Sequence, residues 1–101
     1  MKEKQTRDEI LKALKGEMPN LQEKYYVKRI GIFGSHSRSD STFQSDLDIL
    51  VELKRPVGRE IVDLHCYLEK LLQMKVDLVT KGAVARKPSL WQSIQEDLIY
   101  V

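Results

Sequence analysis

The sequence predicts an α/β (α+β) fold in which a small mixed β-sheet is flanked by helices. Stretches with apolar residues at helical spacing alternate with short runs rich in β-branched residues. The resulting order is helix, helix, strand, strand, helix, strand, helix, which is typical of a small sheet covered by helices. A length of 101 residues suits one domain with a modest core, so residues 1–101 are expected to form a single domain.

The N-terminal part is expected to contain two helices and a strand. Thr6 and Glu9 have the spacing of a capping box that begins a helix, and Gly16 is placed to end it. Pro19 suits the first turn of a second, short helix. β-branched residues within Val27–Phe33 then predict the first strand.

The C-terminal part begins with a break at Lys54–Gly58, where charged residues, proline and glycine meet. Leucines at helical spacing predict a helix over residues 61–72. A third strand is expected over Lys75–Thr80 and a last helix over Pro88–Asp97. The apolar end, Ile99–Val101, suits a short strand or a segment packed on the domain.

Composition excludes several classes of protein. A net charge of +2 is too small to indicate a nucleic-acid binder, and no direct contact with nucleic acid is expected. No apolar stretch approaches the roughly 18 residues that span a membrane, and the first residues lack the apolar segment of a signal peptide. The single cysteine, Cys66, cannot form an internal disulfide. The cytoplasm is therefore the expected location.

Two carboxylates, Asp46 and Asp48, open a second predicted strand that runs from Asp46 to Leu53. Side chains two positions apart in a strand point to the same face, so these carboxylates are expected to project together while Leu47 and Ile49 cover the buried face. Neighbouring carboxylates repel one another unless a cation lies between them. Oxygen ligands favour Mg²⁺ or Mn²⁺ over zinc.

The loop before this strand is suited to a polyphosphate. Gly34 lets the backbone approach a ligand closely, and the N–H groups and hydroxyl at Gly34–Ser35 suit phosphate oxygens. Arg38 can pair with a phosphate, although a solvated loop cation is an equally good interpretation. His36 is expected on the surface. Together with the carboxylates, this loop predicts metal-assisted chemistry on a nucleoside triphosphate.

A third carboxylate would complete such a site and help to deprotonate an acceptor hydroxyl. Asp77 is the best candidate because it lies in a predicted strand with apolar neighbours and therefore needs a partner. The alternative is a salt bridge to Lys75 or Lys81. Two metal ions about 4 Å apart can stabilise both the entering and the leaving oxygens of a phosphoryl-type transfer.

Gly34-Ser35 followed by Ser45-Asp46-Leu47-Asp48 resembles the signature of the DNA polymerase β-like nucleotidyltransferase superfamily. More narrowly, the chain resembles the minimal nucleotidyltransferases (MNT-type antitoxins), the small antitoxin partners of HEPN-domain toxins. The similarity covers nearly the whole chain, including the later Val76-Asp77-Leu78 strand. The resemblance implies a polymerase β-like nucleotidyltransferase fold and a single nucleotidyltransferase domain over residues 1–101.

The same resemblance implies roles for individual residues. The matching positions are, for the nucleotide, Gly34, Ser35, Arg38 and Ser45, and, for catalysis and the metal ions, Asp46, Asp48 and Asp77. Two positions depart from the family's Gly-Ser-Arg-Ala-Arg-Gly run, because His36 replaces the first arginine and Ser39 the second glycine.

The function that the resemblance implies is transfer of AMP from ATP, with Mg²⁺, to a tyrosine hydroxyl of a cognate HEPN-type toxin held in a heteromeric complex. A chain of 101 residues has little room for an acceptor domain, which favours a protein acceptor over a small molecule. Two alternatives remain open: an antitoxin that neutralises its toxin by binding alone, and a nucleotidyltransferase acting on a small molecule such as an aminoglycoside.

Overall fold

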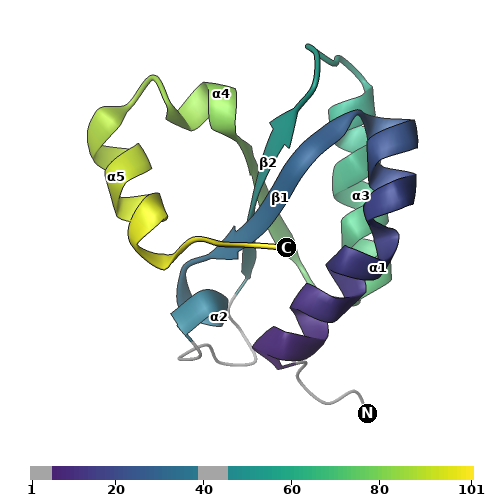
Figure 1. Ribbon diagram of the computed structural model, residues 1–101, viewed down its shortest axis with the longest axis horizontal. Coiled ribbons are helices and arrows are strands. Elements are labelled where there is room, and N and C mark those ends of the chain that lie inside the picture. The colour runs from purple at the N-terminus through teal and green to yellow at the C-terminus, as the bar shows by residue number, and fades with distance from the viewer. Residues whose placement is uncertain (1–5, 39–45) are drawn as a thin grey trace.

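A four-stranded mixed sheet forms the centre of the protein in a computed structural model that describes residues 6–38 and 46–101 (Figure 1). The strands are β1 (Val27–Phe33), β2 (Leu47–Leu53), β3 (Val76–Thr80) and β4 (Ile99–Tyr100), in the spatial order β3-β2-β1-β4. β1 is antiparallel to both of its neighbours, and β2 and β3 are parallel. The mixed sheet flanked by helices confirms the predicted fold class.

Helices cover both faces of this sheet. Figure 1 shows α1 (Arg7–Tyr25) and α3 (Glu60–Leu72) on one side and α4 (Lys81–Val84) and α5 (Pro88–Asp97) on the other. Strand residues alternate between the two layers. Ile49 and Val51 of β2 join the larger core under α1 and α3, whereas Leu50 packs with Val84 and Ile94 in the smaller core under α4 and α5.

The expectation of two N-terminal helices is wrong, because one helix continues through Pro19. The capping box is confirmed, with the Thr6 hydroxyl accepting from the Glu9 N–H and the Glu9 carboxylate accepting from the Thr6 N–H. Ile10, Leu14 and Leu21 lie on one stripe of α1 and are fully buried, and only a continuous helix buries all three. This burial outweighs the roughly 3 kcal/mol that an interior proline costs.

Two short helices each follow closely after a strand. α2 (Ser35–Arg38) is a single turn that follows β1 after Gly34, and α4 is capped by Thr80, whose hydroxyl accepts from the Ala83 N–H at 3.3 Å. The strand predicted to begin at Asp46 begins instead at Leu47. Within the described residues, no helix combines the length and the apolar character that a membrane-spanning segment requires.

Candidate active site

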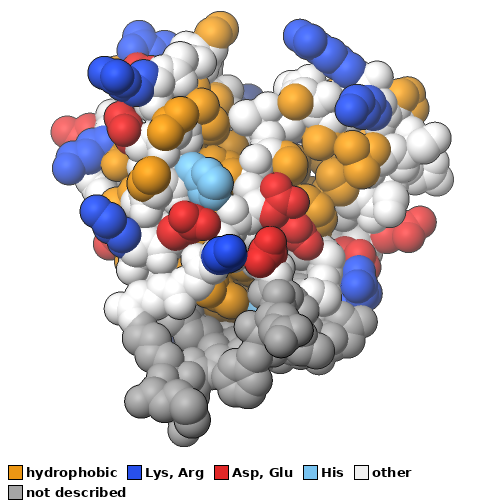
Figure 2. Space-filling model, turned by 180° about the vertical axis from the view of Figure 1, so that it is seen from behind, with side chains coloured by type: hydrophobic (Ala, Val, Ile, Leu, Met, Phe, Trp, Pro, Cys, Tyr) orange, Lys and Arg blue, Asp and Glu red, His pale blue; other side chains and the backbone are white. Residues whose placement is uncertain are grey.

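The parallel pairing of β2 and β3 places two of the predicted carboxylates side by side. Asp48 is the register partner of Asp77, so both side chains leave the same face of the sheet on adjacent strands. The Asp48 side chain is half-buried and that of Asp77 is exposed. Figure 2 shows acidic side chains gathered on this side of the molecule, next to the residues that are not described. The predicted proximity of Asp48 and Asp77 is therefore present in the structure.

This environment disfavours the charged form of Asp48. Burial, the negative charge of Asp77 and a hydrogen bond with Asp77 together raise the pKa of the Asp48 carboxyl from 3.8 to about 6, and burial is the largest of these causes. Asp46 adds a smaller repulsion, whereas His36 lowers the pKa. A divalent cation beside Asp48 would offset this repulsion and favour the charged form of the carboxylate.

Gly34 brings the backbone turn after β1 against this carboxylate. Its φ of 75° lies in the left-handed region, and a Cβ at this position would lie 2.3 Å from Oδ2 of Asp48. The left-handed backbone favours glycine, and a Cβ here would force the Asp48 carboxylate to shift. The turn predicted to bind a triphosphate is therefore in contact with the carboxylate predicted to bind the metal.

α2 continues from this turn and is tied to both ends of the chain. The N–H groups of Ser37 and Arg38 donate to the Gly34 carbonyl, each at 3.1 Å. The Ser37 hydroxyl donates to the Asp97 carbonyl, and Nη1 of Arg38 lies 2.7 Å from Oδ2 of Asp97. Nη1 of Arg7 donates to the Ser37 carbonyl at 3.1 Å. Arg38, predicted to pair with a phosphate, therefore also contacts the end of α5.

The expectation that His36 lies on the surface is wrong. Its side chain is only 3% exposed, and it acts electrostatically on Asp48. The single turn of α2 directs His36 and Ser37 inward and leaves Arg38 exposed. Sequence reasoning also missed Asp97, since nothing in the sequence connects a helix end to a loop 59 positions earlier.

The remaining predicted site residues fall into two groups. Ser35 begins α2 and is half-buried, and Asp46 is exposed just before β2, near enough to raise the pKa of Asp48. Ser39 and Ser45 lie outside the described residues.

The donor set fits a hard cation that arrives with a nucleotide. Over residues 6–38 and 46–101, no group of three or more His, Cys, Asp or Glu side chains is arranged to hold a metal ion by itself. Mg²⁺ in phosphoryl-transfer sites is typically bound by one or two carboxylates together with water and substrate phosphates, rather than by a complete protein cage. Asp48 and Asp77, with the Gly34 turn beside them, match that pattern.

Comparison with known proteins decides the family. Residues 10–101 match the model of the nucleotidyltransferase domain. The chain belongs to this nucleotidyltransferase family. The expectation of an enzyme of this class is therefore confirmed.

Similar nucleotidyltransferases have closely matching lengths. A Methanocaldococcus jannaschii protein, provisionally named a protein adenylyltransferase, is 48% identical over 97 residues, covering 95% of this chain and 98% of its own. Protein adenylyltransferase MntA of Thermococcus cleftensis is 35% identical over 97 residues, covering 95% of this chain and 96% of its own.

Solved structures share the fold. A provisionally named minimal nucleotidyltransferase superposes with a TM-score of 0.76 at 26% identity, covering 94% of this chain and 95% of its own. The MNT antitoxin in complex with the tri-AMPylated HEPN toxin of Shewanella oneidensis has a TM-score of 0.58 at 23% identity, covering 93% of this chain and 66% of its own. The second likeness shows the fold alone.

Proposed function

We propose that this nucleotidyltransferase is a Mg²⁺-dependent adenylyltransferase and the antitoxin of a HEPN-type toxin, to which it transfers AMP from ATP. The contact between the Gly34 turn and the paired carboxylates Asp48 and Asp77 carries the proposal. The relatives named protein adenylyltransferases support it because they match this chain over nearly its whole length. The complex of an MNT antitoxin with a tri-AMPylated HEPN toxin supports the choice of partner.

In this proposal the strand carboxylates bind metal and the turn after β1 binds the triphosphate. Asp46 and Asp48 ligate metal together with Asp77, while Gly34 and Ser35 hold the triphosphate at the backbone, joined by the side chains of Arg38 and Ser45. When bound, Mg²⁺ neutralises triphosphate charge and stabilises the leaving pyrophosphate. The residues that ligate metal lie on or directly beside strands, so their spacing is fixed by the sheet.

The acceptor is a tyrosine hydroxyl of the toxin. Its oxygen forms a bond to the α-phosphorus of ATP, the bond from that phosphorus to the bridging β-phosphate oxygen breaks, and pyrophosphate leaves. Asp77, whose carboxylate is exposed, takes the hydroxyl proton in this proposal. The half-buried Asp48 is covered on one side by the Gly34 turn and is less accessible to the acceptor.

Transfer of radioactive AMP tests this proposal. The chain is incubated with α-labelled ATP, Mg²⁺ and its cognate HEPN-type toxin, and in parallel with the toxin carrying phenylalanine at the modified tyrosine. We expect label on the wild-type toxin, none on the phenylalanine variant, and a loss of at least about a hundredfold in rate with Asp48→Asn, because a site built on metal-bound phosphate loses a ligand.

Asp63→Asn is the matched control. Asp63 is exposed on α3, so this variant removes the same charge away from the site and should label the toxin at the wild-type rate. Wild-type labelling by Asp48→Asn, or no labelling by any form of the chain, would contradict the proposal.

A binding-only antitoxin is the second candidate, and the position of His36 favours it. The first basic position of the family's nucleotide-binding run is occupied here by a buried histidine rather than by an exposed arginine. That change weakens the expected grip on the triphosphate. Neutralisation of the toxin by the wild-type chain, without label on the toxin, would establish this second function.

A further inference from the structure

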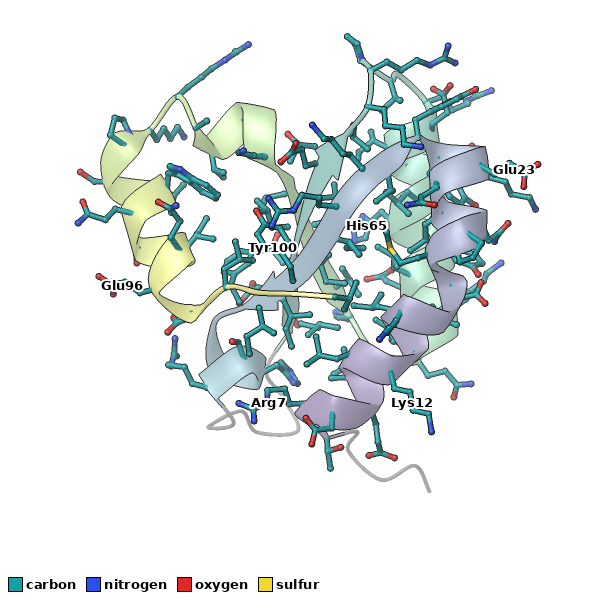
Figure 3. All side chains as sticks on the ribbon, viewed as in Figure 1. Arg7, Lys12, Glu23, His65, Glu96 and Tyr100 are labelled. Atoms are coloured by element: carbon teal, nitrogen blue, oxygen red, sulfur yellow. The ribbon has the colours of Figure 1, made fainter. Side chains whose placement is uncertain are left out.

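Asp97, the last residue of α5, makes two contacts with the one-turn helix α2. Its carboxylate pairs with the Arg38 guanidinium at 2.7 Å, and its carbonyl accepts from the Ser37 hydroxyl. Figure 1 shows α2 below α5 at the edge of the molecule, and Figure 3 shows Arg7 directed at α2 from α1. Two helices from opposite ends of the chain therefore hold this turn in place.

α2 needs such support because of its length. A helix of four residues lies far below the length at which a helix is stable without tertiary contacts. Its own backbone provides the bonds from Ser37 and Arg38 to the Gly34 carbonyl, and the other hydrogen bonds described above run to Asp97 and Arg7. The direction in which α2 presents its exposed side chain therefore depends on Asp97.

We propose that Asp97 is a positioning residue of the nucleotide site, which fixes Arg38 and α2 in the orientation that receives the triphosphate. This inference rests on the proposed function, in which Arg38 binds phosphate. A guanidinium carries its N–H donors in a rigid planar fork, so a carboxylate that holds one edge also fixes where the rest of the fork points. The Arg38 side chain is 48% exposed, so a ligand can reach it while Asp97, at 25%, holds it from the protein side.

Whether removal of the Asp97 carboxylate weakens or strengthens ATP binding distinguishes a positioning role from simple charge repulsion. Asp97 is negative and lies close to the residue that binds a highly negative ligand. If it acted only through space, its removal would strengthen ATP binding by reducing repulsion. If it acts through Arg38, its removal weakens ATP binding because Arg38 and α2 lose their fixed orientation.

Isothermal titration calorimetry of Mg·ATP with the full chain measures this change in ATP affinity and needs no acceptor. We expect Asp97→Asn to weaken ATP binding about three- to tenfold, the range for the net contribution of one typical hydrogen bond. In the transfer assay its KM for ATP should rise by the same factor while kcat changes little. Asp97→Glu, which keeps the carboxylate, should recover part of the affinity.

Glu96→Gln is the matched control. Glu96 precedes Asp97 on α5, and Figure 3 shows its side chain directed away from the rest of the protein. This variant removes one negative charge from the same helix turn without touching α2, so ATP binding should stay within twofold of the wild type. Thermal unfolding of each variant verifies that the chain is folded.

A charge exchange tests the inference independently. In Arg38→Asp with Asp97→Arg the ion pair is rebuilt in reverse, so the unfolding temperature should recover toward the wild type. ATP affinity should not recover, because an aspartate now occupies the phosphate-binding position. A purely structural ion pair would instead restore both quantities together.

The outcomes distinguish this inference from the proposed function. If Asp97→Asn binds ATP as tightly as the wild type or more tightly, the inference is wrong, while AMP transfer that depends on Asp48 still stands. If toxin labelling does not depend on Asp48, the proposed function is wrong whatever Asp97 does. If the wild type binds no Mg·ATP, both are wrong.

Discussion

Replacing Asp48 with asparagine should stabilise the ligand-free protein and abolish its activity. Asparagine keeps the size of the side chain and removes the charge that burial and Asp77 disfavour. The native state binds this proton more tightly than the unfolded chain, because the pKa of Asp48 is raised. The unfolding free energy of the wild type therefore falls as the pH rises from about 4 to about 6.

The size of the gain follows from the pKa of Asp48. A rise from 3.8 to about 6 corresponds to about 3 kcal/mol at neutral pH, taking about 1.4 kcal/mol for each pH unit. The side chain is only half-buried, so solvent screening reduces this to about 1–2 kcal/mol. For a chain of this size, such a gain raises the unfolding temperature by about 5–10 °C.

Denaturant unfolding of Asp48→Asn and the wild type from pH 4 to pH 8 measures this difference. The two proteins should be nearly equal in stability at pH 4 and differ fully above pH 6. Saturating Mg·ATP at pH 7.5 should stabilise only the wild type. Glu23→Gln, an exposed change on α1 (Figure 3), should alter stability by less than about 0.5 kcal/mol at every pH. An asparagine variant that is less stable than the wild type at pH 8 would refute the view that Asp48 carries an electrostatic cost.

Two glycine positions give further predictions. Gly34→Ala should lower the unfolding free energy by about 2–3 kcal/mol, because alanine is strained at a φ of 75° and its Cβ meets the Asp48 carboxylate. The same variant should bind Mg·ATP more weakly in calorimetry. Wild-type affinity would contradict the role of this turn. Gly31→Ala should loosen the pairing of β4 with β1, because the added Cβ would lie 2.7 Å from the Ile99 carbonyl oxygen. In the wild type the Val101 N–H donates to the Ile30 carbonyl at 3.0 Å, and hydrogen exchange of this N–H should accelerate at least tenfold in the variant. Unchanged protection would show that the strand edge accommodates the methyl group.

The sheet and its carboxylates were predictable because their signal is local. A period of two residues along β2 separates Asp48 from Ile49, and a similar period in β3 separates Asp77 from Val76. These alternations, with the glycine at the end of β1, predicted which side chains share a face before any pairing of strands was known. The parallel register that joins Asp48 to Asp77 is a tertiary feature that the structure supplies.

The continuous α1 and the inward position of His36 were not predictable in the same way. Gly16 and Pro19 are local signals for a helix boundary, but the stripe from Ile10 to Leu21 packs on the sheet and overrides them. His36 is buried because α2 folds against β1 and the end of α5, which are contacts between distant parts of the chain. Propensity and spacing contain no information about such contacts.

The two parts of the proposed site depend on different kinds of contact, so substitutions should affect them differently. The carboxylates that we propose to bind metal depend on strand registers that the core fixes, so a substitution in α2 should leave the spacing of Asp48 and Asp77 intact. The turn that we propose to bind nucleotide depends instead on a few polar contacts, chiefly those of Asp97 with Arg38 and Ser37. Sequence departures such as His36 can therefore alter the grip on the triphosphate without disturbing the carboxylates. Loss of Asp97 should change the affinity for ATP, whereas loss of Asp48 should remove the chemical step itself.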